Sequence, residues 1–343
     1  LSLDVNAAWQ ILHGALPFGM RFQVRNGDET IPAMQWVLEG NEMSGWTLNH
    51  GEKKLPSHGT DALPSGRQGL KLVLEGGSNT GQGHEDQWLA VMSQCGLKLD
   101  QPIVFLGQTY QLRDIVSQSM WDVYEGKECS WTLIALANYL DDYDKEWTVS
   151  DGSKWTIEKL IAMEADQDLG DSACGGTHRL IGMTMALDNH LEKGGEIRDG
   201  WKTAEEKIGG AIETAFAMQN LDDGSFSTNY FDRPGASPDL AKRIGTTGHT
   251  LEFLSLALDK DQLADPRMEH AAVHLCDLFE ATKPTNLECG ALYHAAHGLI
   301  EYRERRWGPW TYPDAEKETK GTATPSQPSD AADVGEPKNG NKT

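Results

Sequence analysis

The segment CGGTHRLIGMTMAL, residues 174–187, contains the pattern that decides the fold. Small residues and a histidine lead directly into an apolar run, and the hydrophobic residues of that run occupy both faces of the expected helix. A helix that is hydrophobic nearly all round is buried on most sides. The segment therefore predicts an internal helix whose first turn carries polar and chemically reactive side chains.

The same pattern occurs six times along the chain. The runs are NAAWQILHGALPFG (6–19), GQGHEDQWLAVMSQCGL (81–97), ECSWTLIALANYL (128–140), CGGTHRLIGMTMAL (174–187), GTTGHTLEFLSLAL (245–258) and ECGALYHAAHGLIEY (288–302). Comparable positions in the six runs are His13, His84, Ser130, His178, His249 and His294. Successive positions are separated by 71, 46, 48, 71 and 45 residues. One helical hairpin needs about 40–50 residues, so each interval accommodates one hairpin, with loop insertions in the two long intervals.

Segments with a one-sided hydrophobic pattern lie between the internal runs. They are residues 109–121, 156–165, 201–219 and 266–281, with a weaker candidate at 33–40. Apolar residues recur there every three or four positions and charged residues occupy the rest, as in amphipathic helices. Two Gly- and Pro-containing stretches, 41–82 and 222–244, are expected to be loop or short-strand excursions. The sequence predicts an all-α fold, an α/α toroid of about six helical hairpins with inner and outer rings.

Composition excludes two classes of function. The 343 residues include 52 acidic and 30 basic side chains, a net charge of −22, which repels the phosphate backbone of nucleic acids. No apolar run approaches the roughly 20 residues that cross a bilayer, so we expect no transmembrane segment. An odd number of cysteines, five, leaves at least one thiol free or intermolecular and does not form a disulfide framework.

The C-terminal stretch differs from the rest of the chain. From Pro313 onward aromatic and branched aliphatic residues almost disappear, and such a composition does not bury enough area to offset chain entropy. We therefore expect a toroid domain at 1–312 and a disordered acidic and polar tail at 313–343. The first residue is Leu and no basic and apolar leader follows, so the compartment stays open, with export after removal of a signal as one option.

One segment carries a family resemblance. AFAMQNLDDGSF (215–226), with Gln219, Gly224, Ser225 and Phe226, resembles the Gln-Trp repeat of terpenoid cyclases, in which the Gln caps a helix and an aromatic ring stacks on the next loop. Together with the alternating helices of 6–302, it makes the chain similar to the α/α toroids. These include terpenoid cyclases, protein prenyltransferase β subunits, several polysaccharide lyases and glycosidases, and a largely uncharacterised bacterial family near them.

Two motifs of those families are missing. The acidic cluster LDDYD (140–144) ends an internal helix, whereas the Asp-x-Asp-Asp proton donor of the cyclases lies at the cavity. The Asp-x-Cys zinc motif of prenyltransferases is also absent from the sequence. The resemblance therefore bears on the fold rather than on the chemistry.

A toroid of this kind implies that the first turns of its inner helices surround one central cavity. Imidazoles and carboxylates gathered there can move protons near neutral pH. The predicted catalytic residues are His84, Glu128, His178, His249 and Glu252. The predicted substrate-binding residues are Asp86, Trp88, Trp131, Arg179, Glu288 and His294. A sugar acid could pair its carboxylate with Arg179 and stack its ring on Trp131, so we expect lyase or glycosidase chemistry on an oligosaccharide or another small-molecule ligand.

Other hypotheses remain open at this point. The sequence demands no cofactor, but Cys174, His178, Cys289 and His294 offer two thiolates and two imidazoles, a set suited to tetrahedral zinc. An isoprenoid-processing enzyme is a further alternative. A binding or scaffold module, in which the same histidines and glutamates only cap helices, is another. His297 is expected to be a core residue, and the sequence does not define substrate or oligomeric state.

Overall fold

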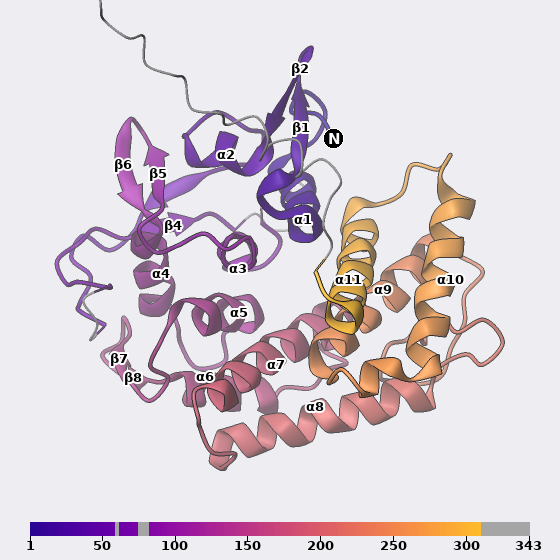
Figure 1. Ribbon diagram of the computed structural model, residues 1–343. Helices are drawn as coiled ribbons and strands as arrows, with labels where there is room; N and C mark the ends of the chain where they lie inside the picture. The colour runs from indigo at the N-terminus through magenta and orange to yellow at the C-terminus, as the bar shows by residue number, and fades with distance from the viewer. Residues whose placement is uncertain (59–61, 75–81, 310–343) are drawn as a thin grey trace, which may run out of the picture. The chain divides into compact units, whose positions relative to one another are not determined.

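The computed structural model describes residues 1–58, 62–74 and 82–309 (Figure 1). Residues Leu1–Trp307 form one unit by their internal contacts, and all elements described below belong to it. The tail predicted at 313–343 lies outside the described residues.

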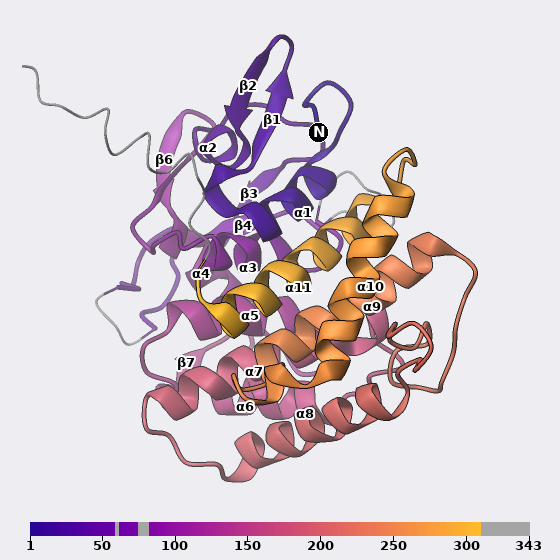
Figure 2. The same cartoon turned by 45° about the vertical axis from the view of Figure 1, so that its right-hand side comes forward.

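Each of the six predicted internal runs contains a helix. These helices are α1 (Ala8–Phe18), α3 (Gln87–Gln94), α5 (Ser130–Tyr139), α7 (Thr177–Glu192), α9 (Leu240–Ala257) and α11 (Cys289–Trp307). Each helix contacts the next one in this series, and α11 contacts α1 (Figures 1 and 2). The six helices therefore follow one another in a closed series of contacts, although their sequences lie far apart.

The amphipathic segments form the remaining α-helices of the described chain. They are α2 (Ala33–Leu38), α4 (Leu112–Trp121), α6 (Ile157–Asp166), α8 (Asp199–Ala217) and α10 (Pro266–Thr282). Each of them packs on at least one helix of the first series. Local signals set their ends: the Thr156 side chain accepts the backbone N–H of Lys159 at the start of α6, and Asp265 followed by Pro266 begins α10. The prediction of a mostly helical protein is confirmed.

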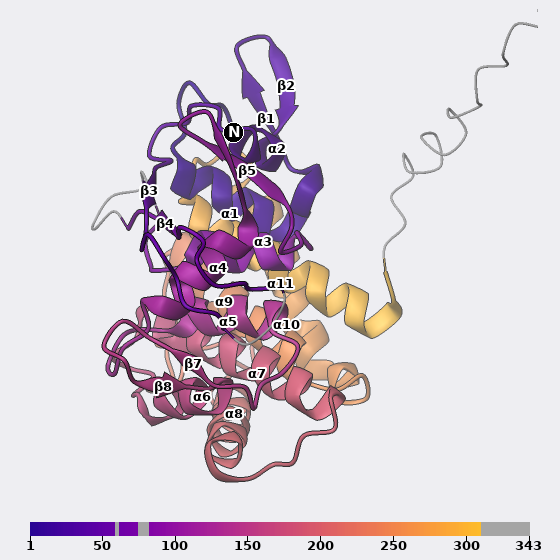
Figure 3. The ribbon, with the colours of Figure 1, turned by 90° about the vertical axis from the view of Figure 1, so that its left-hand side faces the viewer.

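The expectation of an all-α fold needs one correction, because the described chain also contains four two-stranded antiparallel hairpins. Their strands are β1 (Gln23–Asn26) with β2 (Glu29–Pro32), β3 (Leu48–His50) with β4 (Leu70–Leu72), β5 (Pro102–Phe105) with β6 (Gln108–Gln111), and β7 (Trp147–Thr148) with β8 (Lys154–Trp155). Three of the hairpins lead directly into α2, α4 and α6, and only β3 and β4 fall in a predicted excursion. Figure 3 shows β1, β2 and β5 close to α2, which contacts β2 and β5.

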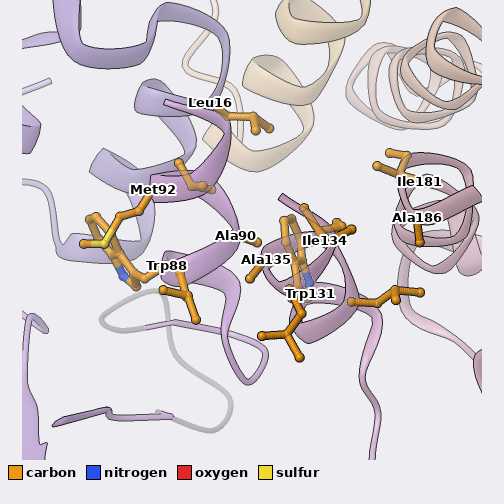
Figure 4. Packing of buried hydrophobic residues seen from close by; sticks show 14 of the residues in the cluster. Leu16, Trp88, Ala90, Met92, Trp131, Ile134, Ala135, Ile181 and Ala186 are labelled. Carbon is orange, nitrogen blue, oxygen red and sulfur yellow. The ribbon is translucent and has the colours of Figure 1, made fainter. Parts of the chain in front are cut away.

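A single buried hydrophobic cluster joins both sets of helices. Figure 4 shows Ala90 of α3 and Ala135 of α5 between their two helices, where small side chains allow close packing. Three tryptophans, Trp147, Trp155 and Trp201, are fully buried, consistent with a packing role. All five cysteines are free. Within the described residues, no helix has the length and hydrophobicity that spanning a bilayer requires.

The segment that resembles a Gln-Trp repeat follows α8 and is hydrogen-bonded to α10. The side-chain amide of Gln219 donates to the carbonyl of Gly224 (2.8 Å) and to the carbonyl of Arg267 in the first turn of α10 (2.9 Å). Phe226 is buried and its ring packs edge-on against Phe216 of α8, with 6.3 Å between the centroids. One glutamine therefore joins the loop after α8 to the start of α10.

Candidate functional site

A cavity of about 330 Å³ lies among several helices of the first series, with His178 in the first turn of α7 but His249 in the third turn of α9, which begins at Leu240. Its lining comes from α1, α3, α7, α9 and α11 and from the loops that precede them. The lining residues are Trp9, His13, His84, Gln87, Cys174, His178, Tyr230, Ala241, Lys242, Gly245, Thr246, His249, Glu288, Gly290, Ala291 and His294. The four histidines that the sequence assigns to the site all line this cavity, and they come from four different stretches of chain.

Cys174 reaches the cavity through an unusual turn at the start of α7. Cys174, Gly175 and Gly176 all have left-handed backbone conformations, with φ of 52°, 62° and 78°. Glycine adopts this conformation readily, whereas cysteine does so only at an energetic cost. The two glycines also allow close approaches by other side chains: a Cβ on Gly175 would lie 2.3 Å from the Tyr230 ring. The turn thereby places the strained Cys174 on the cavity wall.

Four imidazole rings pack against one another in this cavity. The ring centroids of His249 and His294 are 4.2 Å apart, His178 lies 5.0 Å from His294 and 5.3 Å from His249, and His13 lies 5.4 Å from His294. All four side chains are buried. Burial lowers the pKa of His178 well below its ordinary value and that of His13 to about 3, with a further lowering from neighbouring imidazoles. These two rings are therefore neutral at physiological pH.

Hydrogen bonds orient three of the rings. Nδ1 of His13 lies 2.6 Å from the carbonyl oxygen of Trp9, and Nδ1 of His249 lies 2.7 Å from that of Gly245, in each case one helical turn earlier. Nδ1 of His294 lies 2.8 Å from a carboxylate oxygen of Glu252. Because a carbonyl or carboxylate oxygen only accepts, Nδ1 carries the proton in neutral His13 and His294. That tautomer leaves an Nε2 lone pair for another partner.

Glu252 lies behind the cavity wall and bridges two histidines. Its other carboxylate oxygen is 2.6 Å from Nδ1 of His297, whose Nε2 is 3.5 Å from Glu301. Burial alone raises the pKa of Glu252, but the contacts with His294 and His297 hold it well below its ordinary value. Burial likewise lowers the pKa of His297, and the two carboxylates outweigh it and raise the pKa to about 10. Glu252 is thus an anion that orients His294 rather than part of the cavity lining.

Three side chains form a group that could bind a metal ion. One ligand atom each from Cys174, His178 and His249 lies within 4.8 Å of the other two. In a filled tetrahedral zinc site such atoms are roughly 3.3–3.6 Å apart, so coordination requires a modest contraction. Both ring nitrogens of His178 and Nε2 of His249 are buried, with no hydrogen-bond partner among the described residues. Burial lowers the pKa of His249, but the Cys174 sulfur and Glu252 outweigh it and raise the pKa to about 9.

This group corrects the zinc set expected from the sequence. Cys174 and His178 are shared, but His249 takes part instead of Cys289, which does not line the cavity. Cys289 and His294 are five residues apart on α11, so their side chains point about 140° apart around the helix axis. The two residues therefore do not face the same point. His294 remains on the cavity wall, with its ring against that of His249.

The other predicted residues lie at the rim or outside the cavity lining. Glu128 is half-exposed and lies 3.1 Å from Nδ1 of His84, which stays within the lining. Glu288 lines the cavity but also caps α11, accepting the backbone N–H groups of Gly290 and Ala291. Trp131 is buried behind His178, with 4.6 Å between the ring centroids. Glu128 and Trp131 thus adjoin the site without facing its cavity.

Three predicted substrate-binding residues have structural partners away from the cavity. Asp86 accepts hydrogen bonds from the hydroxyls of Ser119 and Thr132. The ring of Trp88 packs against Trp46, with 4.8 Å between the centroids. Arg179 forms a buried ion pair with Glu164 at 3.1 Å, and that carboxylate also accepts the backbone N–H of Cys129. We therefore leave Asp86, Trp88 and Arg179 out of the site.

Sequence reasoning missed Trp9, His13, Tyr230 and Lys242 as cavity residues. His13 occupies the position equivalent to the other histidines in the first run, so the repeat itself contains the signal. Tyr230 lies in the 222–244 excursion, where no periodic pattern indicates a position in space. It also lines an open polar groove of about 1,080 Å³ beside α8, and it is the one residue described as lining both hollows.

The site thus combines a cavity, four packed imidazoles, a thiol and a buried carboxylate. No protein-family model, curated protein or solved structure matches this chain, so the function of the site follows from its own geometry.

Proposed function

We propose that the chain is a metal-dependent enzyme with an α/α-toroid fold, and that Cys174, His178 and His249 hold a zinc-type divalent ion in the cavity. The toroid is supported by the closed series of contacts from α1 to α11 and by the helices that alternate with it in sequence and pack on it. The Gln219 bridge between α8 and α10 is a further similarity to the toroid families.

The single observation that carries the metal proposal is that His178 has no hydrogen-bond partner among the described residues. Its two buried nitrogens have no partner in the described chain, and a buried polar group without a partner loses about 1–3 kcal/mol. One ligand atom each of Cys174, His178 and His249 lies within 4.8 Å of the other two. A neutral imidazole, a second imidazole oriented by a backbone carbonyl and a thiolate form a common type of zinc ligand set. A metal ion would give one nitrogen of His178, one nitrogen of His249 and the Cys174 sulfur a common partner.

The remaining side chains of the cavity suit catalysis. A bound zinc ion would lower the pKa of a water ligand toward about 7 and polarise a substrate carbonyl. His294 lies against His249 and presents a ring that Glu252 holds in one tautomer, so its Nε2 can accept a proton from a group in the cavity. Lys242 and Glu288 place a positive and a negative charge in the lining for a polar substrate.

A second candidate is metal-free acid–base catalysis on a carbohydrate by the His294 and Glu252 pair. The observation that favours it is the 2.8 Å contact between them, which resembles the carboxylate–imidazole arrangement of general bases. The cavity also mixes an aromatic ring, Trp9, with charged groups. A scaffold role is less well supported, because a purely structural histidine is hydrogen-bonded, and His178 is not.

Metal analysis of the purified full-length chain tests the first proposal. We expect close to one equivalent of a divalent metal, and a loss of at least about 10-fold in zinc affinity for His178→Ala and His249→Ala, since each removes a ligand. His270→Ala, an exposed histidine on α10, serves as the control and keeps the wild-type affinity. If wild-type protein binds zinc no better than the two ligand variants, the metal proposal is wrong and the acid–base candidate takes its place.

A further inference from the structure

Tyr230 stands between the cavity and the open groove. It belongs to a loop that is closed by its own hydrogen bonds: the backbone N–H of Thr228 donates to the carbonyl of Gly235 (3.1 Å), and the hydroxyl of Ser227 donates to the carbonyl of Arg233 (2.6 Å). The side-chain amide of Asn220 also donates to Gly235 (3.3 Å), which anchors the loop at the end of α8. The loop is therefore a fixed support for the side chain that it presents.

The backbone of Tyr230 is strained. Its φ is 52°, in the left-handed region, which is unfavourable for a bulky residue. The backbone N–H of Tyr230 donates to the carbonyl of Ser227 at 3.0 Å, so the surrounding loop holds this conformation in place. Strained residues of this kind cluster at functional sites, where the surrounding structure over-determines them. The contacts of the Tyr230 side chain are therefore candidates for a functional role.

The side chain packs on the turn that carries the candidate metal ligand. The ring lies so close to Gly175 that a Cβ there would overlap it, and its edge faces the ring of His249 at 6.3 Å between centroids. Tyr230 and Cys174 both line the cavity, next to this close contact. A tyrosine hydroxyl carries its proton at physiological pH, so it can only act as the donor toward a thiolate.

We propose that Tyr230 is a positioning residue for Cys174, whose hydroxyl donates a hydrogen bond to the sulfur and fixes it toward His178 and His249. This inference rests on the proposed metal centre. A hydrogen bond to a coordinating sulfur withdraws electron density from it, and outer-shell partners of this kind tune both affinity and electronic properties of metal sites. No residue assigned from the sequence supplies this interaction.

Tyr230→Phe removes the hydroxyl and keeps the ring, and cobalt in place of zinc reports on the sulfur directly. We expect cobalt affinity to fall by about 10-fold. We also expect the sulfur-to-cobalt charge-transfer band to move to longer wavelength, because a sulfur without its hydrogen bond gives up electron density more easily. Tyr293→Phe is a matched control, since Tyr293 is a half-buried tyrosine beside a different thiol, Cys289. The control is expected to leave both readouts unchanged.

A metal-independent measurement separates this inference from the proposed function. In metal-free full-length protein, Tyr230→Phe should lower the urea midpoint when Cys174 is present and much less when Cys174 is replaced by Ala, because the two groups interact. Additive effects of Tyr230→Phe and Cys174→Ala, together with an unshifted cobalt band, would overturn the inference even if metal binds. Failure of wild-type protein to bind cobalt removes the metal centre, and the mutant cycle still decides whether Tyr230 holds the sulfur.

Discussion

The carboxylate of Glu252 lies between two imidazole rings, 2.8 Å from Nδ1 of His294 and 2.6 Å from Nδ1 of His297. Both oxygens of the carboxylate are therefore used as acceptors. An amide in the same place offers only one oxygen, so it leaves one imidazole without its acceptor and removes the negative charge that balances His297. The buried contacts with His294 and His297 therefore require a carboxylate at this position.

Glu252→Gln is expected to destabilise the protein by about 3–5 kcal/mol, the range for breaking a buried ion pair by removing one partner. Urea unfolding of the two proteins at pH 7 measures the change. Glu128→Gln is the control, because its half-exposed pair with His84 contributes at most about 1 kcal/mol. Equal losses from the two substitutions would contradict the role given to Glu252.

His297 makes stability depend on pH on the alkaline side. Its pKa is raised from 6.5 to about 10 in the folded protein, so the folded state binds the proton more tightly than the unfolded state. Stability from this group is fully present below pH 6.5 and is lost as the pH rises toward 10, by at most about 1.4 kcal/mol per pH unit. Urea midpoints measured between pH 6 and 10 should fall.

Two variants isolate the contribution of His297. His297→Gln should flatten the alkaline decline relative to wild type, because the titrating group is gone. Glu301→Gln should move the decline to lower pH, because Glu301 is one of the carboxylates that raise the pKa of His297. A decline of the same slope in wild type and His297→Gln would assign the pH dependence to another group.

At the residue level, the sequence predicted which histidines share the cavity but not how they are paired. His84, His178, His249 and His294 occupy equivalent positions in repeated runs, so their convergence follows from the repeat. The ligand set depends instead on helix rotation and on the left-handed turn at Cys174, and neither leaves a periodic signal. The partners of Arg179 and Asp86 likewise depend on tertiary contacts.

Helices α9 and α11 pack so closely that parts of their backbones meet with no side chain between them. A Cβ added to Gly248 would lie 2.6 Å from the Cα of Ala295, and one added to Gly298 would lie 2.8 Å from the backbone nitrogen of Glu252. This close approach is what brings Glu252 of α9 within hydrogen-bonding distance of His294 and His297 on α11. The spacing of two helices therefore sets the geometry of the buried carboxylate.

Gly248→Ala should destabilise the protein by about 1–3 kcal/mol, because the added methyl group forces the helices apart. Gly209→Ala on α8 is the matched substitution, since a Cβ there meets nothing within 4 Å. It should stabilise the protein by about 0.5–1 kcal/mol through helix propensity alone. Thermal or urea unfolding of both variants checks the opposite signs, and a neutral Gly248→Ala would show that the interface adjusts.

The helices were easier to predict than the strands. Each helix of the first series overlaps an apolar run of ten or more residues, which is a strong signal, although α7, α9 and α11 extend beyond their predicted runs. The hairpins before α2 and α6 are short, and their turns are marked only by Asn26-Gly27 and Asp151-Gly152, pairs that favour tight turns. These two pairs indicate the hairpins in the sequence, but a search for helical periodicity alone does not detect them.

For the molecule as a whole, the excess of 52 acidic over 30 basic residues produces self-repulsion that unfolding relieves. Raising sodium chloride from low to moderate concentration screens that repulsion, so the thermal midpoint at pH 7 should rise. Repeating the scan near the isoelectric point of about 4.8 provides the control, because the net charge is then close to zero and the salt effect should largely disappear. A midpoint at pH 7 that does not respond to salt would contradict this expectation.

The cavity is assembled from residues between Trp9 and His294, and α1 at the beginning of the described chain packs on α11 near its end. Until a ribosome has added α11, the nascent polypeptide has neither His294 nor the wall that α11 contributes. A prematurely terminated product lacks the same wall. The proposed metal centre is therefore complete only when synthesis has passed α11, and incomplete copies carry the separate thiol and imidazoles without it.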